Sequence, residues 1–462
     1  MVVPPEDWRA PLLAGLPLRS ADGPARPSVS WAPAVLAGHA VVLVVWDFTV
    51  AGGSLGERDG SSWVQATDYA VRTARPVVAL VRSGGTRLTE GIGALVGMAR
   101  ATIARQRLAD AGVPLIAVGD APTTGGVFVT IVSRADVRCA VTGATVGFAG
   151  PRVVEAVTGS LPGPGSHTAA TATAAGLVDA EVAPGCVASW LRGVLDALAG
   201  RPELPAAGAP DPTTGPAAGP AVGSGWDAVT AARAPGRPGA GELLGRLLSG
   251  PVPLLAAHGD TSCAAAVGQL AGGAAVAVAV AARPGGRPTP DGFRLLGRAA
   301  RLADRLDLPL VTLVDTPGAE PGPAAEADGL AGTIAEAMAA VLACRSPTLG
   351  VLVGEGGSGG ALAALGCDLV LACPSSYFAA LLPEGAAVAL RTSPREAAEA
   401  MALRPADVLA LGVVDALVPD GADPAFVPRV AAALAGLAAA ADAPRRAARL
   451  ARWSGPAPSH AG

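Results

Sequence analysis

Residues 309–318 read Pro-Leu-Val-Thr-Leu-Val-Asp-Thr-Pro-Gly, and residues 76–85 read Pro-Val-Val-Ala-Leu-Val-Arg-Ser-Gly-Gly. Each segment is a short apolar run rich in β-branched residues that ends in glycine, as is typical of a buried strand entering a tight turn. After each turn come about 25 residues with a helical pattern, then a second apolar run and a second glycine cluster. The sequence therefore predicts one strand–turn–helix–strand–turn unit that occurs twice.

The later glycine clusters keep the spacing of the first ones. There are 41 positions between Gly84 and Gly125, and again 41 between Gly318 and Gly359, so the halves are offset by 234 positions at both landmarks. Each half then closes on a similar phrase, Gly-Leu-Val-Asp-Ala in one and Gly-Val-Val-Asp-Ala in the other. Matched landmarks in one register indicate an internal duplication.

The domain organisation follows from this duplication. Residues 201–225 contain six prolines and almost no large apolar side chain, a composition that indicates a semi-extended linker. Two α/β domains are expected on either side of it, at 30–200 and 226–440. We expect the arginine-rich tail, 441–462, to be a solvated helix end.

The composition limits the classes of partner. The net charge is −4, which argues against nucleic acid as a partner. The 34 basic residues are all arginine, and the absence of lysine excludes a catalytic lysine or covalent attachment of biotin or lipoate to this chain. The apolar runs are too short to cross a membrane. The six cysteines show no C-x-x-C pair and are expected to be reduced thiols of a cytoplasmic protein. The four histidines are far apart in sequence, so no metal site is expected.

The glycine turns suggest chemistry carried by the backbone. A strand-to-helix turn presents free N–H groups at the start of a helix, where negative charge is favoured. Two such donors aimed at one oxygen form an oxyanion hole, and the duplication predicts two holes. No Ser-His-Asp order, H-E-x-x-H or G-x-G-x-x-G after a strand is present, and Gly354–Gly360 is not followed by the lysine of a phosphate loop.

The first half resembles a known enzyme subunit. The run Val146-Gly-Phe-Ala-Gly-Pro-Arg-Val153, together with Ser83–Arg87 and Trp46–Ser54, resembles the β subunit of bacterial acetyl-CoA carboxylase carboxyltransferase. This resemblance covers about residues 38–185.

The second half resembles the α subunit of the same enzyme, over about residues 226–420. Its motifs are Val314–Gly322, Gly354–Leu362 and Leu382–Gly385. The order, β-like then α-like in one chain, is similar to single-chain acyl-CoA carboxyltransferases.

The resemblance implies two crotonase-like (ββα-spiral) domains in tandem, with active sites formed between the N-terminal domain of one protomer and the C-terminal domain of another. It implies transfer of CO2 from carboxybiotin to the α-carbon of an acyl-CoA, such as acetyl-CoA to malonyl-CoA, through enolates held in the two holes. Biotin would be supplied by a biotin carboxyl carrier protein, with a biotin carboxylase also in trans. A homodimer or a trimer of dimers is expected.

The resemblance also assigns the site residues. Gly84 and Gly85 would hold the thioester oxygen, and Gly360 and Ala361 the biotin ureido oxygen. The expected substrate-binding residues are Gly125 and Gly126 beside the first hole, Arg87 and Arg152 as candidates for the CoA phosphates, and Phe148, Gly359 and Ala363 along the pocket.

Several departures from the family pattern leave alternatives open. Residues 1–38 lack the four cysteines of a zinc ribbon, Glu320 replaces a tyrosine, and the charged residues that usually follow Gly-Asp early in the α-like half are replaced after Asp260. A biotin-independent malonyl-thioester decarboxylase would use the same type of hole. A degenerate subunit that only scaffolds a carboxylase complex is the third alternative.

Overall fold

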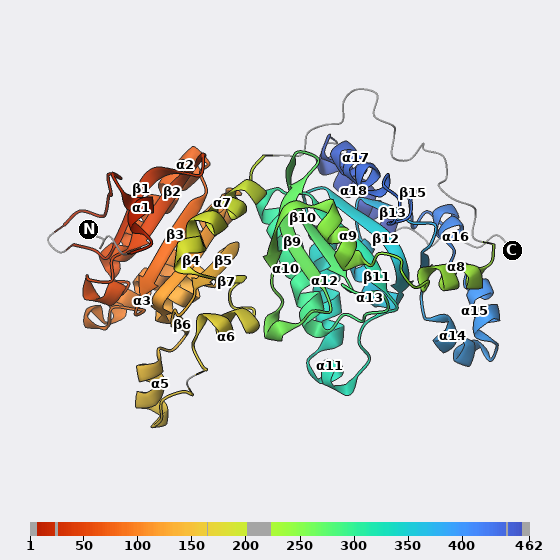
Figure 1. Cartoon of the computed structure of the whole chain (residues 1–462), viewed down its shortest axis with the longest axis horizontal. Helices are drawn as coiled ribbons and strands as arrows, with labels where there is room; N and C mark the ends of the chain where they lie inside the picture. The colour runs from red at the N-terminus through yellow and green to blue at the C-terminus, as the bar shows by residue number, and fades with distance from the viewer. Residues whose placement is uncertain (1–6, 24–25, 164, 201–222, 440–441, 455–462) are drawn as a thin grey trace. The chain divides into compact units, whose positions relative to one another are not determined.

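The structure is a computed structural model that describes residues 7–23, 26–163, 165–200, 223–439 and 442–454. It divides into two compact units (Figure 1). Unit 1 consists of Met1–Leu195 with Ala257–Gly259, and unit 2 of Asp196–Ala256 with Asp260–Gly462. Most of the predicted linker, 201–222, lies outside the described residues.

Unit 1 contains a seven-stranded sheet with the order β1-β2-β3-β4-β5-β7, and β6 pairs with β4. Strands β1 and β2 are antiparallel, and the other pairings are parallel. The strands are β1 Val29–Leu36, β2 His39–Trp46, β3 Val77–Ser83, β4 Leu115–Thr124, β5 Val137–Val141, β6 Val146–Gly147 and β7 Ala180–Val182.

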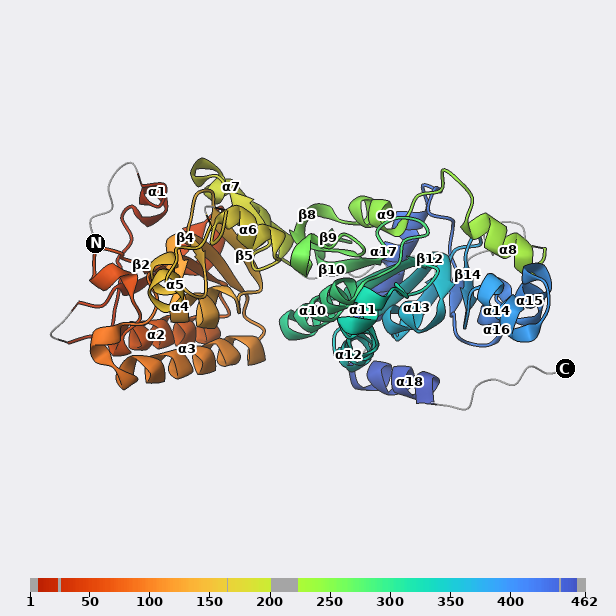
Figure 2. The ribbon, with the colours of Figure 1, turned by 90° about the horizontal axis from the view of Figure 1, so that it is seen from below.

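Unit 1 contains two long helices, α2 and α3, and several short ones. Helices α2 and α3 lie side by side along one face of this unit (Figure 2). The helices are α1 Ala10–Leu13, α2 Glu57–Thr73, α3 Ile92–Asp110, α4 Gly125–Val127, α5 Pro151–Thr158, α6 Ala169–Ala174 and α7 Val187–Ala197.

Unit 2 contains an eight-stranded sheet with the order β15-β13-β12-β11-β10-β9-β8, and β14 pairs with β12. Strands β9 to β15 therefore repeat the topology of β1 to β7, and β8 is an additional edge strand. The strands are β8 Ser249–Leu254, β9 Ala264–Leu270, β10 Gly273–Val280, β11 Leu310–Thr316, β12 Thr348–Gly357, β13 Leu369–Ala372, β14 Tyr377–Ala379 and β15 Ala416–Leu417.

The helices of unit 2 are α8 Gly225–Ala232, α9 Ala240–Leu247, α10 Pro290–Leu306, α11 Pro323–Ala327, α12 Leu330–Ala343, α13 Ser358–Leu365, α14 Pro383–Leu390, α15 Pro394–Ala400, α16 Pro405–Ala410, α17 Phe426–Ala439 and α18 Asp442–Ser454. Some of these helices lie on the faces of the eight-stranded sheet, and a further group, α8 with α14 to α16, packs together beside it (Figure 1).

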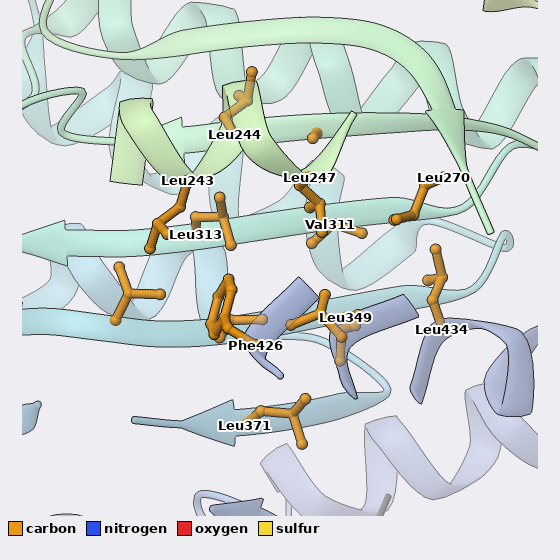
Figure 3. Close-up of a cluster of buried hydrophobic side chains, with 14 of the residues drawn as sticks. Leu243, Leu244, Leu247, Leu270, Val311, Leu313, Leu349, Leu371, Phe426 and Leu434 are labelled. Atoms are coloured by element: carbon orange, nitrogen blue, oxygen red, sulfur yellow. The ribbon is translucent and has the colours of Figure 1, made fainter. Parts of the chain in front are cut away.

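Alternating side chains of the parallel strands build the core of unit 2 (Figure 3). Val311 and Leu313 of β11 point to the face covered by α9 and α17, where they meet Leu243, Leu247 and Phe426. Burial of each such side chain is worth about 1.5–3 kcal/mol relative to exposure. This packing holds the carboxyl ends of the central strands, and the glycine turns that follow them, in place.

The closing phrases of the two halves play the same structural role. The N–H of Asp179 donates to Arg138 O at 2.7 Å, and the Asp179 carboxylate accepts from Arg138 N at 3.1 Å. Asp415 makes the same two bonds with Val370, both at 2.7 Å. Each aspartate therefore fixes the start of the last parallel strand of its sheet, as expected for a duplicated unit.

The expectation of a solvated helix end at the C-terminus is wrong for the described part of that tail. Arg445 and Arg449 of α18 are buried against unit 2. Arg445 Nη1 donates to Asp368 Oδ2 at 2.8 Å, and Arg449 Nη1 donates to Thr348 Oγ1 at 2.8 Å. Arg452 pairs with Asp415. The helix is thus held on the domain by ion pairs with carboxylates that lie far away in the sequence.

Among the described residues, no single helix has the length and apolar composition needed to cross a membrane. Residues Phe426–Ala438 and Asp442–Ser454 meet the length and composition test only as a pair, and this pair is bent by 113°.

Candidate active site

The first glycine turn of unit 1 follows β3. The N–H of Gly84 donates to Gly52 O at 2.9 Å, and the N–H of Gly85 donates to Ser83 Oγ at 3.1 Å. Both groups are therefore engaged within the protein. The expectation that Gly84 and Gly85 present their N–H groups to a thioester oxygen is revised accordingly.

The corresponding turn of unit 2 shows the same design. Gly318 N donates to Thr316 Oγ1 at 3.1 Å, as Gly85 N does to Ser83 Oγ. This match pairs Gly85, rather than Gly84, with Gly318, so the halves are shifted by one residue at this turn from the register expected. The counterpart of Gly84 is then Pro317, which has no N–H to donate.

The next amide along each turn has a different environment. Thr86 and Ala319 are half-buried, and no acceptor within the described ranges pairs with their N–H groups. Thr86 bridges to Leu55, but the bonds of that bridge use Gly85 O and Arg87 N, so the Thr86 N–H is directed elsewhere. These two amides are available to bind an oxygen atom.

Each of these amides lies against the start of a helix. A Cβ added to Gly125 would lie 3.6 Å from Thr86 N, and a Cβ added to Gly360 would lie 2.9 Å from Ala319 N. Helix α4 continues as a π-helical turn over Phe128–Val132, and neither α4 nor α13 has a side chain that caps its first turn. First-turn N–H groups have no acceptor within their own helix.

The two units therefore carry one arrangement of backbone donors. In each, a free amide of the first glycine turn meets the N-terminal turn of the helix that follows the second glycine cluster. Partial positive charge from both sources favours an oxyanion there.

The predicted glycines around the holes differ in accessibility. Gly125 is half-buried and its N–H donates to Phe148 O at 2.7 Å, whereas Gly126 is buried. A Cβ at Gly359 would meet no atom within 4 Å, so this position faces open space. Ala361 and Ala363 have no exposed surface in unit 2, and Gly126 and Gly360 are also buried; all four stay predictions as site residues.

The predicted cations also separate into two kinds. Arg87 Nη2 lies 2.5 Å from the buried carboxylate of Asp59, and Arg87 Nη1 lies 3.1 Å from Glu90. Its guanidinium is thus paired with two carboxylates of unit 1, and its role on the CoA phosphates stays a prediction. Arg152 lies exposed on α5, and Phe148 is 70% exposed. Both stay predictions as substrate-binding residues.

A polar cluster lies near the end of β12 in unit 2. Buried Glu355, at the end of β12, accepts a 2.7 Å hydrogen bond from the Tyr377 hydroxyl and another of 2.7 Å from Arg233 Nε. Arg233 also pairs with Glu384 at 2.5 Å. Burial raises the pKa of Tyr377 and the Glu355 carboxylate raises it further, so the phenol remains a donor. In the sequence, the signal for such a cluster is the single glutamate, Glu355, within an otherwise apolar and glycine-rich strand.

No group of three or more His, Cys, Asp or Glu side chains that could hold a metal ion is found in the described part of the chain.

Comparison with known proteins identifies the family. Residues 21–175 match the family described as "Carboxyl transferase domain", and residues 224–435 match "Acetyl co-enzyme A carboxylase carboxyltransferase-like". A Salinispora arenicola protein named "Acetyl-coenzyme A carboxylase carboxyl transferase subunits beta/alpha" is 40% identical over 413 residues, which cover 84% of this chain and 72% of that protein. The chain belongs to the acetyl-CoA carboxylase carboxyltransferase family.

Further relatives support this assignment. A Mycobacterium tuberculosis protein named "Probable biotin-dependent acyl-coenzyme A carboxylase beta3 subunit" is 35% identical over 449 residues, covering 93% of this carboxyltransferase and 86% of that protein. The transcarboxylase 12S structure matches with a TM-score of 0.73 at 24% identity, over 91% of this chain and 85% of that one. The fold is therefore two tandem crotonase-like domains, and both the resemblance and the fold class inferred from the sequence are confirmed.

Proposed function

We propose that this carboxyltransferase moves a carboxyl group from carboxybiotin to the α-carbon of an acyl-CoA, as in the conversion of acetyl-CoA to malonyl-CoA or a substituted analogue. The observation that carries the proposal is the repeated hole, a free turn amide against a helix N-terminus in each unit. Carboxyl transfer of this kind develops negative charge on two different oxygens, and each would need its own donors.

Each hole is assigned to one of these oxygens. In unit 1, the N–H groups of Thr86 and Gly126 hold the thioester oxygen and stabilise the charge that develops when the α-proton leaves. In unit 2, the N–H of Ala319 and the first-turn N–H groups of Gly359 and Gly360 hold the biotin ureido oxygen. No atom lies within 4 Å of a Cβ added at Gly359, so this side of the hole is open. Carboxybiotin supplies the activated carboxyl group when bound.

The partners follow from the absence of lysine in the chain. Biotin must arrive on a separate carrier protein, with a biotin carboxylase to charge it, because this chain offers no lysine for its attachment. Free cysteines are typical of cytoplasmic proteins, so we propose that the reaction takes place in the cytoplasm.

Exposed apolar side chains on both units suggest an oligomer. Val153, Val157 and Leu161 on and beside α5 are 57–81% exposed, and Val388 on α14 is 81% exposed. Clusters of this kind are commonly covered by a second protein surface. We propose a homodimer or a trimer of dimers in which unit 1 of one protomer faces unit 2 of another.

The test is loss of malonyl-CoA by the purified protein, with and without free biotin, read by mass spectrometry. Loss that requires biotin is expected, because the transferase then runs in reverse. Equal loss without biotin would identify a malonyl-thioester decarboxylase instead. No loss of malonyl-CoA or of substituted analogues such as methylmalonyl-CoA would favour a scaffolding subunit.

A further inference from the structure

The loop that joins β10 to α10 is fastened to the first glycine turn of unit 2. Thr316 Oγ1 donates to Gly286 O at 2.9 Å, and Glu320 N donates to Pro288 O at 3.0 Å. Between these two bonds lies Arg287, whose Nη1 donates to Ala319 O at 3.3 Å. The loop therefore places a guanidinium on the residue whose N–H lines the second hole.

The guanidinium of Arg287 is not neutralised by the protein. It is half-buried, and no carboxylate of the described residues lies within ion-pair distance of it. The nearby carboxylate of Glu320 instead accepts from Gly322 N at 3.2 Å. By contrast, Arg233 and Arg237 of the same unit are both paired with acidic side chains.

Most of the hydrogen-bonding capacity of Arg287 is also unused. A guanidinium has five N–H donors, and the single bond to Ala319 O uses one of them. A cation with spare donors, held by its loop at a hole for an oxyanion, is suited to bind a carboxylate, which it can engage with two parallel bonds.

We propose that Arg287 binds the carboxylate that this enzyme transfers. The inference rests on the proposed function, in which the second hole holds the ureido oxygen of biotin. A carboxylate on the adjacent ureido nitrogen is close to that oxygen, and the same carboxylate ends on the α-carbon of the thioester product. Arg287 stays protonated and makes no covalent bond.

The experiment compares Arg287→Met with wild type in the full-length protein. Calorimetry gives the Kd for malonyl-CoA and for acetyl-CoA, and the malonyl-CoA-to-biotin reaction gives kcat and KM. Arg283→Met is the matched control, because Arg283 lies exposed on the same loop. Arg287→Lys keeps the charge without the two parallel bonds, and is expected to restore part of the loss.

Two results would support the inference and also distinguish the source of the carboxylate. If Arg287 binds the thioester carboxylate, Arg287→Met raises the Kd for malonyl-CoA about tenfold or more, because charge-assisted hydrogen bonds are the strong ones. The Kd for acetyl-CoA, which has no such carboxylate, then stays within about twofold. If the carboxylate is bound on biotin, malonyl-CoA affinity is kept and kcat falls about tenfold or more, with partial rescue by Arg287→Lys.

Three results would overturn it. An equal rise in the Kd for malonyl-CoA and for acetyl-CoA would place Arg287 on the CoA phosphates. Unchanged Kd, KM and kcat, or the same loss in Arg283→Met, would leave Arg287 with no part in binding. Wild-type protein that binds neither thioester and transfers nothing would defeat the proposed function itself, and this inference with it.

Discussion

Gly85 and Gly125 approach each other so closely that neither position has room for a side chain. Gly125 has φ +64°, and a Cβ added there would lie 2.7 Å from Gly85 Cα. Gly85 has φ +111°, and its Cβ would lie 3.1 Å from Gly125 Cα. These glycines bring the two turns of unit 1 together, and through that contact they place the Thr86 amide beside the start of α4.

Gly125→Ala is expected to destabilise unit 1 by about 3 kcal/mol, because a left-handed alanine and a clash with backbone both oppose it. Gly359→Ala is the matched control, since its Cβ would meet no atom within 4 Å. Its unfolding free energy should stay within about 0.5 kcal/mol of wild type. Its turnover should fall, because the methyl group enters the second hole. Urea unfolding and the biotin-dependent assay measure the two effects, and a Gly125→Ala protein as stable as wild type would contradict the packing argument.

The cysteines should differ sharply in reactivity. Burial raises the pKa of Cys263, Cys344 and Cys367 to about 12, so at pH 8 their thiols are protonated and poor nucleophiles. Cys186 is exposed. Iodoacetamide at pH 8 should label Cys186 in the native protein and all six cysteines in urea, as read by peptide mass spectrometry. Rapid native labelling of Cys367 would show that the core of unit 2 is open.

The arginines of helix α18 bind partners that lie far away in the sequence. Its arginines recur at positions that face one side of the helix, and that side meets Asp368, Thr348 and Asp415. The sequence shows the arginines but not their partners, which lie 37 to 101 positions away. A basic amphipathic helix read alone therefore predicts a solvated end, whereas the fold makes it part of unit 2.

Arg449→Met is expected to lower the unfolding free energy of unit 2 by about 3 kcal/mol, because it removes one partner from a buried ion pair. Arg449 is 1% exposed, and its Nη1 lies 3.5 Å from Asp368 Oδ1. Arg446→Met is the control: Arg446 lies exposed on the same helix, and its loss should change stability by less than about 0.5 kcal/mol. Equal stability of the two variants in urea would mean that α18 contributes little to the domain.

The strands and first turns could be predicted, because an apolar run that ends in glycine is a local signal. Strands β3 and β11 lie where residues 76–85 and 309–318 predicted them. The donors of the holes could not be predicted, because an amide is free only if nothing else in the fold takes it. Gly84 N finds Gly52 O, whereas Thr86 N finds no acceptor in the described chain. The register error of one residue has the same origin, since Gly84 and Gly85 are indistinguishable in sequence and differ only in their bonds.

At the scale of the whole molecule, the proposed function assigns one hole to each unit and therefore requires two units for one active site. They could come from one chain or from two protomers. Two variants distinguish these cases: Gly84→Leu in unit 1 and Gly359→Leu in unit 2. An added Cβ at either position meets no atom closer than 3.5 Å, so both variants should fold. In Gly359→Leu the side chain should enter the second hole. In Gly84→Leu it lies exposed on the turn that carries the Thr86 amide and should obstruct access to the first hole, so each variant alone should be inactive in the biotin-dependent assay.

Co-expression of the two variants should restore activity if sites form between protomers. In a mixed dimer, one site combines the two altered units and the other combines the two intact units. Random pairing then gives about a quarter of wild-type activity, because half of the dimers are mixed and each has one intact site. Sites formed within one chain would give none, since every chain carries one blocked hole. Equal amounts of the two chains, checked by mass spectrometry, make the recovered fraction a direct measure of how the units pair.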